Sequence, residues 1–215
     1  MTKWIVLALV IILGALGWFF RGSIMGLFGG GATPAQVHTE ADPLAGWGSY
    51  ASSTMGVTIK YPAGYTVNAA YANTSVNPKK PIAGASFTVP ASMATGTNLG
   101  SDTYLSVEQL PRAKACTGDI FVADNVAAHD VIDGGFTYSV ATTSDAAAGN
   151  RYEESVYAVK DSKPCTAVRY RVHYSAIENY PAGSVREFDR AALIAKFDQI
   201  RRTLQLTGTA ATTTP

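Results

Sequence analysis

Three cationic or titratable side chains lie at alternate positions of one apolar segment: Arg169, Arg171 and His173. Alternate residues of a strand project from the same face about 7 Å apart, so these three would form one stripe. Such a stripe could bind a ligand or an acidic partner that carries phosphate or carboxylate groups. The alternative, which we favour, is an exposed sheet face on which the arginine stems cover apolar surface and an acid such as Glu153 pairs across it.

The two cysteines, Cys116 and Cys165, are 49 residues apart. They could form a disulfide, remain as two buried thiols, or act as a redox pair. A redox pair normally has Cys-x-x-Cys spacing, which this chain lacks. An even pair in a domain outside the cytoplasm favours a disulfide, which would stabilise the fold by about 4 kcal/mol in the chain-entropy model.

The remaining polar residues match no catalytic or metal motif. The histidines, His38, His129 and His173, are far apart and show no metal-ligand spacing, and no Gly-x-Ser-x-Gly elbow supports a serine nucleophile. Carboxylates cluster between residues 119 and 133, but their spacing is not that of an EF-hand calcium loop. We interpret this cluster as a solvated acidic edge formed by Asp119, Asp124, Asp130 and Asp133. The sequence therefore predicts no metal site, no cofactor and no catalytic residue.

The composition limits the classes of protein to which this chain could belong. The 215-residue chain has a net charge of +1, and 47% of its residues are hydrophobic and 15% charged. The balanced charge argues against nucleic-acid binding, because duplex recognition needs a clustered basic face. The hydrophobic content excludes a disordered chain, and residues 49–207 are sufficient for one well-buried domain.

The N-terminus predicts a membrane anchor. Residues 4–20 are uncharged, stand between Lys3 and Arg21, and would span roughly 26 Å as a helix, close to the thickness of the hydrocarbon core. We interpret residues 1–21 as an uncleaved signal-anchor in the cell membrane, with a cleaved signal peptide as the alternative. Lys3 and the α-amine place the N-terminus in the cytoplasm, so this single-pass protein would hold its domain on the extracytoplasmic side. Residues 22–48 read as a Gly/Pro-rich stalk, and residues 208–215 as a disordered Thr-rich tail.

The central region predicts an antiparallel sheet. Apolar residues alternate with polar ones in seven short segments separated by turn signals, at 57–61, 65–71, 85–89, 103–109, 136–141, 151–159 and 166–174. The clearest is 166–174, whose core face would carry Val168, Tyr170, Val172 and Tyr174.

A C-terminal helix should pack on this sheet. Ser184 and Glu187 have the spacing of a capping box, and an apolar face follows at Leu193, Phe197, Ile200 and Leu204. A second, weaker helix is expected over residues 119–128. The predicted fold class is therefore α+β, an antiparallel sheet of about six or seven strands packed by a C-terminal helix and preceded by one N-terminal transmembrane helix.

Two segments of the chain carry a family resemblance. An alternating strand leads into Tyr-Pro-x-Gly-aromatic-x-Val at residues 61–67, and the closing helix ends in Phe-Asp-x-Ile-x-x-Thr-Leu at residues 197–204. This pattern resembles the Mog1/PsbP-like fold, whose members include a photosystem II extrinsic subunit, a nuclear-transport factor and membrane-anchored bacterial proteins. The resemblance implies an α/β/α sandwich over residues 50–207. It carries over no shared catalytic residues.

The leading functional hypothesis is a membrane-tethered extracytoplasmic binding or assembly module without catalytic activity. Its partners would be the lipid bilayer, through residues 4–20, and an unidentified envelope protein. One alternative is an extracytoplasmic hydrolase that uses His173 or His129 with acids elsewhere in the sequence. Another is a structural protein of the envelope or of a filament, for which the Thr-rich tail offers weak support.

Overall fold

The computed structural model describes residues 42–207. The predicted anchor, most of the predicted stalk and the Thr-rich tail lie outside the described residues. Within 42–207 no helix is long and apolar enough to cross a bilayer. The chain divides into two compact units between Pro43 and Leu44, and the sheets and helices below all belong to the second unit.

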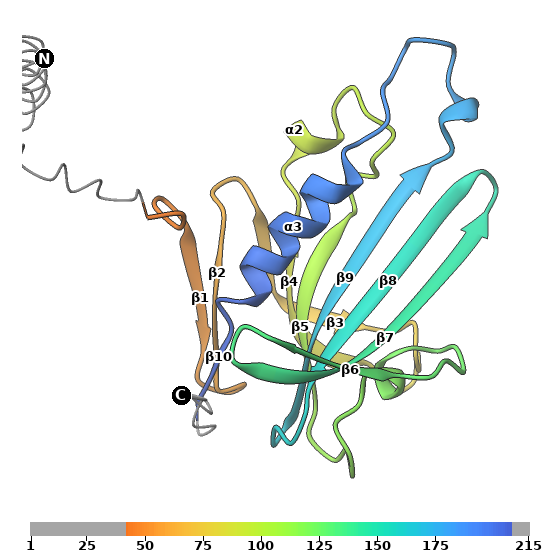
Figure 1. Ribbon diagram of the computed structural model, residues 1–215. Helices are drawn as coiled ribbons and strands as arrows, with labels where there is room; N and C mark the ends of the chain where they lie inside the picture. The colour runs from red at the N-terminus through yellow and green to blue at the C-terminus, as the bar shows by residue number, and fades with distance from the viewer. Residues whose placement is uncertain (1–41, 208–215) are drawn as a thin grey trace, which may run out of the picture. The chain divides into compact units, whose positions relative to one another are not determined.

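A seven-stranded sheet forms the framework of this unit (Figure 1). Every pair of neighbouring strands in it is antiparallel. Its spatial order is β3 (Thr66–Asn73), β4 (Ile82–Thr88), β5 (Tyr104–Leu110), β9 (Cys165–Ser175), β8 (Asn150–Val159), β7 (Phe136–Ala147) and β6 (His129–Asp133). Six of the seven expected strands lie in this sheet. The sequence did not predict β6, an edge strand whose largely exposed residues show no apolar alternation.

A smaller three-stranded sheet contains the remaining expected strand, β2 (Val57–Tyr61). It pairs on one side with β1 (Gly48–Ser52) and on the other with β10 (Gln205–Leu206). The first and last parts of the described chain therefore meet on β2. Neither short partner strand was predicted from the sequence.

Helix α3 (Arg190–Arg201) lies across one face of the large sheet (Figure 1). Its apolar face is almost fully buried: Leu193, Phe197 and Ile200 are each at most 1% exposed. The main core contains these residues together with buried side chains of the central strands, among them Val168 and Tyr170. The expected sheet of about seven strands with a C-terminal helix is confirmed.

The start of this helix differs from the prediction. The Ser184 hydroxyl does not cap a helix but donates to the carbonyl oxygen of Pro181 at 2.8 Å. The N-cap is Asp189, whose carboxylate accepts a hydrogen bond from the N–H of Ala192 at 2.9 Å. The capping box proposed for Ser184 and Glu187 is therefore wrong.

Tertiary hydrogen bonds explain the later start. The N–H of Arg186 donates to the Gly96 carbonyl at 3.1 Å, and the N–H of Asn98 donates to the Arg186 carbonyl at 3.0 Å. Because these backbone groups pair with a distant loop, the chain around Arg186 remains extended instead of forming the first helical turn. A local capping pattern contains no information about such partners.

Arg201, near the C-terminal end of α3, fixes the helix to the sheet. Its side chain is 3% exposed, and the guanidinium donates to the Tyr170 hydroxyl at 2.8 Å and to Asp198 at 3.0 Å. It also lies over the rings of Tyr138 and Tyr157, at 4.7 and 4.3 Å from their centroids. Cation–π contacts of this kind strengthen when the cation is removed from water.

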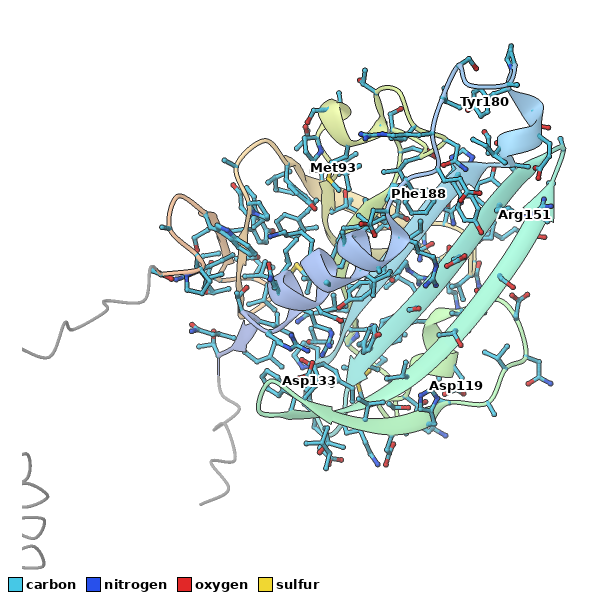
Figure 2. All side chains as sticks on the ribbon, turned by 45° about the horizontal axis from the view of Figure 1, so that its top comes forward. Met93, Asp119, Asp133, Arg151, Tyr180 and Phe188 are labelled. Carbon is cyan, nitrogen blue, oxygen red and sulfur yellow. A yellow bond between two sulfur atoms is a disulfide. The ribbon has the colours of Figure 1, made fainter. Side chains whose placement is uncertain are left out.

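Two of the four carboxylates of the expected acidic edge, Asp130 and Asp133, form ion pairs. Asp133 lies at the end of β6 (Figure 2). It accepts hydrogen bonds from Arg201 and Arg202 at 2.6 and 3.0 Å. Burial acts to raise the pKa of Asp133, but these hydrogen bonds outweigh it and hold the pKa below its ordinary value. Asp130 pairs with Lys160 at 2.7 Å. Within residues 42–207 no three His, Cys, Asp or Glu side chains lie close enough to hold a metal ion.

The second face of the large sheet carries no α-helix within the described residues. A short 3₁₀ helix, η1 (Gly118–Phe121), lies there, and the helix expected over residues 119–128 does not form. Phe121 and Val122 complete a second apolar cluster with Val156 and Ala167 of the central strands. Within the described residues, α3 therefore covers one face of the sheet and only the short η1 covers the other, so the second helical layer of the expected α/β/α sandwich is not seen. Two further short helices, α2 (Ala91–Ala94) and η2 (Ile177–Asn179), lie in connections.

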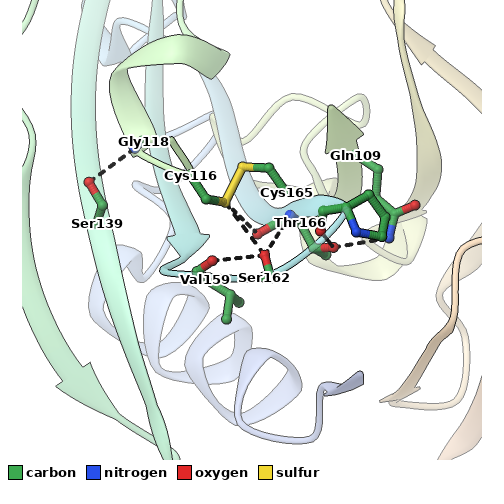
Figure 3. Close-up of a disulfide and its surroundings, with 9 residues drawn as sticks. Gln109, Cys116, Gly118, Ser139, Val159, Ser162, Cys165 and Thr166 are labelled. Carbon is green, nitrogen blue, oxygen red and sulfur yellow. Dashed lines mark hydrogen bonds between the residues drawn. A yellow bond between two sulfur atoms is a disulfide. The ribbon is translucent and has the colours of Figure 1, made fainter. Parts of the chain in front are cut away.

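A disulfide joins Cys116 to Cys165, as the sequence predicts (Figure 3). The two Cα atoms are 5.1 Å apart, within the usual range of about 4.4–6.8 Å. Cys165 is the first residue of β9, and Cys116 lies in the connection between β5 and η1. The bond therefore holds this connection against the end of the large sheet.

A fragment from Leu44 to Thr207 is expected to fold cooperatively on its own, because it contains both apolar clusters, the disulfide and α3. This fragment retains Trp47. The Lys196 ammonium lies over the ring of Trp47, 5.4 Å from its centroid. Thermal unfolding followed by circular dichroism would measure this. A matched fragment of residues 49–207, which lacks Trp47 and the first residue of β1, should melt at a lower temperature. A 44–207 fragment without a thermal transition would contradict the prediction.

Candidate functional site

The structure places Arg169, Arg171 and His173 on one face of β9, but they do not form an exposed cationic stripe. The side chain of Arg169 is 1% exposed, that of Arg171 28% and that of His173 19%. The interpretation of this face as an exposed sheet surface is therefore wrong for Arg169. The reason is that η1 and its flanking segment cover the centre of the second face.

Arg169 is the centre of a buried hydrogen-bonded network, which we call the Arg169 network. Its Nε and Nη2 atoms donate to the two carboxylate oxygens of Glu108 at 2.8 and 3.0 Å. Its Nη1 donates to Glu154, and Nη2 also donates to the Phe121 carbonyl at 2.5 Å. Glu108 is fully buried and accepts a further hydrogen bond from the Ser106 hydroxyl at 2.8 Å. Buried charges are tolerated in proteins when they are paired and hydrogen-bonded in this way.

The network shifts the pKa values of Arg169 and Tyr71. Burial acts to lower the pKa of Arg169, but the hydrogen bond and charge of Glu108 outweigh it and raise the pKa above its ordinary value. Burial, followed by the nearby charge of Glu108, raises the pKa of Tyr71, whose hydroxyl donates to that carboxylate at 3.3 Å. Arg169 is thus held as a cation, and the centre of the Arg169 network is closed to solvent.

The two outer members of the stripe also have partners. Arg171 pairs with Glu154 and lies 5.3 Å from the centroid of the Tyr152 ring. His173 faces Asp102 through Nδ1 at 2.6 Å and Asn150 through Nε2 at 3.2 Å. The acids that pair with the stripe are Glu108, Glu154 and Asp102, whereas Glu153 pairs with Arg190. An anionic ligand would have to displace a carboxylate from each cation, so we place the candidate site elsewhere.

A groove at the end of the large sheet is the stronger candidate. It lies where β4 begins and β5 ends, between the β1–β2 hairpin and the connection that follows β5, and has a volume of about 880 Å³. In Figure 1 the connection after β5 lies below the lower end of the sheet. We call this groove the cationic groove. Its lining residues are Thr54, Met55, Lys80, Pro81, Ala83, Gln109, Leu110, Pro111, Arg112, Ala113, Lys114, Ala115 and Ile120. Eight of these thirteen residues are apolar.

Three cations and no acid line this groove: Lys80, Arg112 and Lys114. All three are exposed, and within residues 42–207 none of them has a carboxylate within ion-pair distance. By contrast, Arg169 and Arg171 on the neighbouring face are paired. A volume in the range of small-molecule sites, an apolar lining and a few charged groups are typical of ligand pockets.

Two smaller hollows have mixed charge. One, of about 430 Å³, lies between α2 and the start of α3 and includes Arg186, Glu187, Asp189 and Lys196 in its lining. The other, of about 260 Å³, lies over Arg171 and the outer part of the second sheet face. No histidine lines the cationic groove or either of these hollows. The hydrolase hypothesis, which required a pocket at His173 or His129, gains no support from them.

Sequence reasoning did not identify the groove residues as a site. A signal was present, because Lys79, Lys80 and Pro81 form one basic loop and residues 111–114 form another. Each loop alone looks like an ordinary solvated connection. The two come together only because β4 and β5 are neighbours in the sheet, and local sequence patterns do not encode that pairing.

No family model matches the chain, and no curated protein matches it. Solved structures with some similarity include a crystal structure from Bacteroides thetaiotaomicron, with 10% identity and a TM-score of 0.42, covering 74% of this chain and 47% of that one. This chain therefore spans about half the length of the Bacteroides protein. They also include a cyanobacterial PsbP from Synechocystis, with 11% identity and a TM-score of 0.32, covering 75% of this chain and 93% of that one. The similarity to both concerns the fold alone.

Proposed function

We propose that this protein is a membrane-tethered extracytoplasmic binding module without catalytic activity, and that its ligand lies in the cationic groove. The observation that carries the proposal is the groove itself, with its apolar lining and three cations that have no acidic partner among the described residues. Burial of an apolar ligand on such a surface removes water from both partners and stabilises the complex by about 25 cal/mol per Å² of apolar area.

Two features support the extracytoplasmic location. Disulfides persist in oxidising compartments, and the bond between Cys116 and Cys165 links elements that flank the groove. The apolar run of residues 4–20 has the length and flanking charges of a signal-anchor. A tether of this kind would hold the protein at the membrane, where apolar ligands and envelope proteins are concentrated.

The face of β9 that carries Arg169, Arg171 and His173 is better explained by a structural role than by a catalytic one. Both ring nitrogens of His173 face oxygen atoms of neighbouring side chains, Asp102 and Asn150. These two partners are a carboxylate and an amide oxygen, and neither is a hydroxyl or thiol from which a general base could remove a proton. We therefore favour binding over hydrolysis.

Photolabelling of the full chain tests the proposal. A hexadecanol analogue that carries a diazirine is expected to label peptides containing groove residues, detected by mass spectrometry. Ala83→Trp places an indole in the groove and should reduce this labelling severalfold, because the apolar space is then occupied. Ala146→Trp changes an exposed alanine of β7 outside the groove and is the matched control. Absence of groove labelling in the unaltered chain, or equal labelling in the two variants, would contradict the proposal.

A further inference from the structure

The charge around the cationic groove is distributed unevenly. Lys79 adjoins Lys80 in the same loop, and neither has a carboxylate partner among the described residues. Lys163 lines a small adjoining hollow that shares Met55 and Gln109 with the groove. No acid lines either space. Five cations without an acidic partner in the described chain thus gather at one end of the large sheet: Lys79, Lys80, Arg112, Lys114 and Lys163.

An apolar surface next to unpaired cations is complementary to a molecule that combines an apolar body with a negative charge. Lys80 belongs to the loop before β4, whereas Arg112 and Lys114 belong to the connection after β5. The cations therefore come from two loops that both contribute to the same groove. A focused positive potential of this kind raises the local concentration of anions and their rate of association.

An extended peptide is a poor occupant of this groove. A bound peptide needs partners for its backbone N–H and C=O groups, which are costly to bury unpaired. Peptides that add to sheets use a free strand edge, but β4 and β5 each pair with a strand on both sides. The amide nitrogen of Gln109 already donates to the Met55 carbonyl and the Thr166 hydroxyl, at 2.7 and 2.9 Å. An acyl chain has no such polar groups to satisfy.

We propose that the ligand of the cationic groove is an anionic acyl amphiphile, with its acyl chain along the apolar lining and its carboxylate or phosphate group at Lys80, Arg112 and Lys114. This inference rests on the proposed function, because it specifies the ligand class of the same groove. The same chemistry is available from a free fatty acid and from an anionic phospholipid of the bilayer. Charge-assisted hydrogen bonds from lysine and arginine suit both headgroups.

The experiment uses the full chain in phosphatidylcholine vesicles and compares diazirine-bearing palmitate with the hexadecanol analogue of equal chain length. Palmitate should label the groove peptides at roughly tenfold lower concentration, because three exposed charge contacts each contribute modestly. The triple variant Lys80→Gln, Arg112→Gln, Lys114→Gln should abolish this preference, so that palmitate and hexadecanol label the groove peptides at similar concentrations. The control Lys60→Gln, Arg151→Gln, Arg186→Gln removes the same net charge from residues outside the groove and should preserve the preference.

A second arm distinguishes the source of the ligand. Diazirine-bearing phosphatidylglycerol is compared with the phosphatidylcholine analogue in the same vesicles. Preferential groove labelling by phosphatidylglycerol supports a bilayer lipid, whereas labelling by palmitate alone supports a free fatty acid.

Several results would overturn the inference. Groove labelling by hexadecanol with no preference for palmitate would overturn the anionic ligand and leave the proposed function intact. A preference lost equally in both triple variants would show that net charge, and not the groove, is responsible. Displacement of the probe by a short acidic apolar peptide, at concentrations where palmitate does not displace it, would assign the groove to a protein ligand. No groove labelling by any probe would contradict both the inference and the proposed function.

Discussion

Replacement of Arg169 by methionine is expected to lower the free energy of unfolding by about 3–5 kcal/mol, because it leaves Glu108 buried without its cationic partner. The Phe121 carbonyl would lose a hydrogen-bond donor as well. Small domains have a total stability of about 5–15 kcal/mol, so the variant should lose a large share of its stability. Urea denaturation of the 44–207 fragment, with the disulfide intact, would measure the change.

Arg190→Met is the matched control. Arg190 also pairs with a glutamate, Glu153, at 2.6 Å, but its side chain is 59% exposed. Exposed ion pairs typically contribute less than about 1 kcal/mol, so this variant should be nearly as stable as the unaltered fragment. A loss for Arg169→Met no larger than that for Arg190→Met would show that the Arg169 network does not stabilise the fold.

A double variant separates the pairing of Arg169 from its packing. Glu108→Gln removes the buried negative charge but retains an acceptor for the Ser106 hydroxyl. When Arg169→Met is combined with Glu108→Gln, the loss of stability should be smaller than the sum of the two single losses by more than about 1 kcal/mol. Such non-additivity is expected for residues in direct contact within one hydrogen-bond network. Additive losses would indicate that the two side chains act independently.

The Arg169 network also illustrates what could be predicted from the sequence. Alternation along residues 166–174 correctly separated the face of Val168 and Tyr170 from the face of Arg169. The period of a strand determines which residues share a face. It does not determine what covers that face, and burial of Arg169 depends on η1 and on Glu108 from β5, which are distant in sequence.

The same distinction applies to the rest of the fold. Long, strongly alternating segments predicted six strands of the large sheet, and the spacing of Leu193, Phe197 and Ile200 predicted the buried face of α3. The short strands β1, β6 and β10 were missed because pairing with a neighbouring strand, not local alternation, maintains them. Non-local pairing likewise creates the cationic groove, since its cations come from loops that are distant in sequence.

Replacement of both Cys116 and Cys165 by serine is expected to lower the free energy of unfolding by about 4 kcal/mol. The bond connects residues separated by 49 positions, and its loss enlarges the conformational freedom of the unfolded chain. Urea denaturation of the 44–207 fragment would measure the loss. A reducing agent should destabilise the unaltered fragment by a similar amount and leave the serine variant unchanged. A variant that matches the oxidised protein in stability would contradict the prediction.

The same substitution should also weaken the proposed ligand site. Arg112 and Lys114 lie in the connection that the disulfide holds at Cys116, directly after β5. Without the bond this connection loses its covalent attachment to the start of β9, and ordering it again would oppose binding. Under conditions where the variant remains folded, hydrogen exchange should therefore increase at residues 111–117 more than in α3, and palmitate labelling of the groove should decrease. Unchanged exchange at residues 111–117 together with unchanged labelling would show that the connection is held by packing alone, and that the disulfide stabilises the domain without shaping the groove.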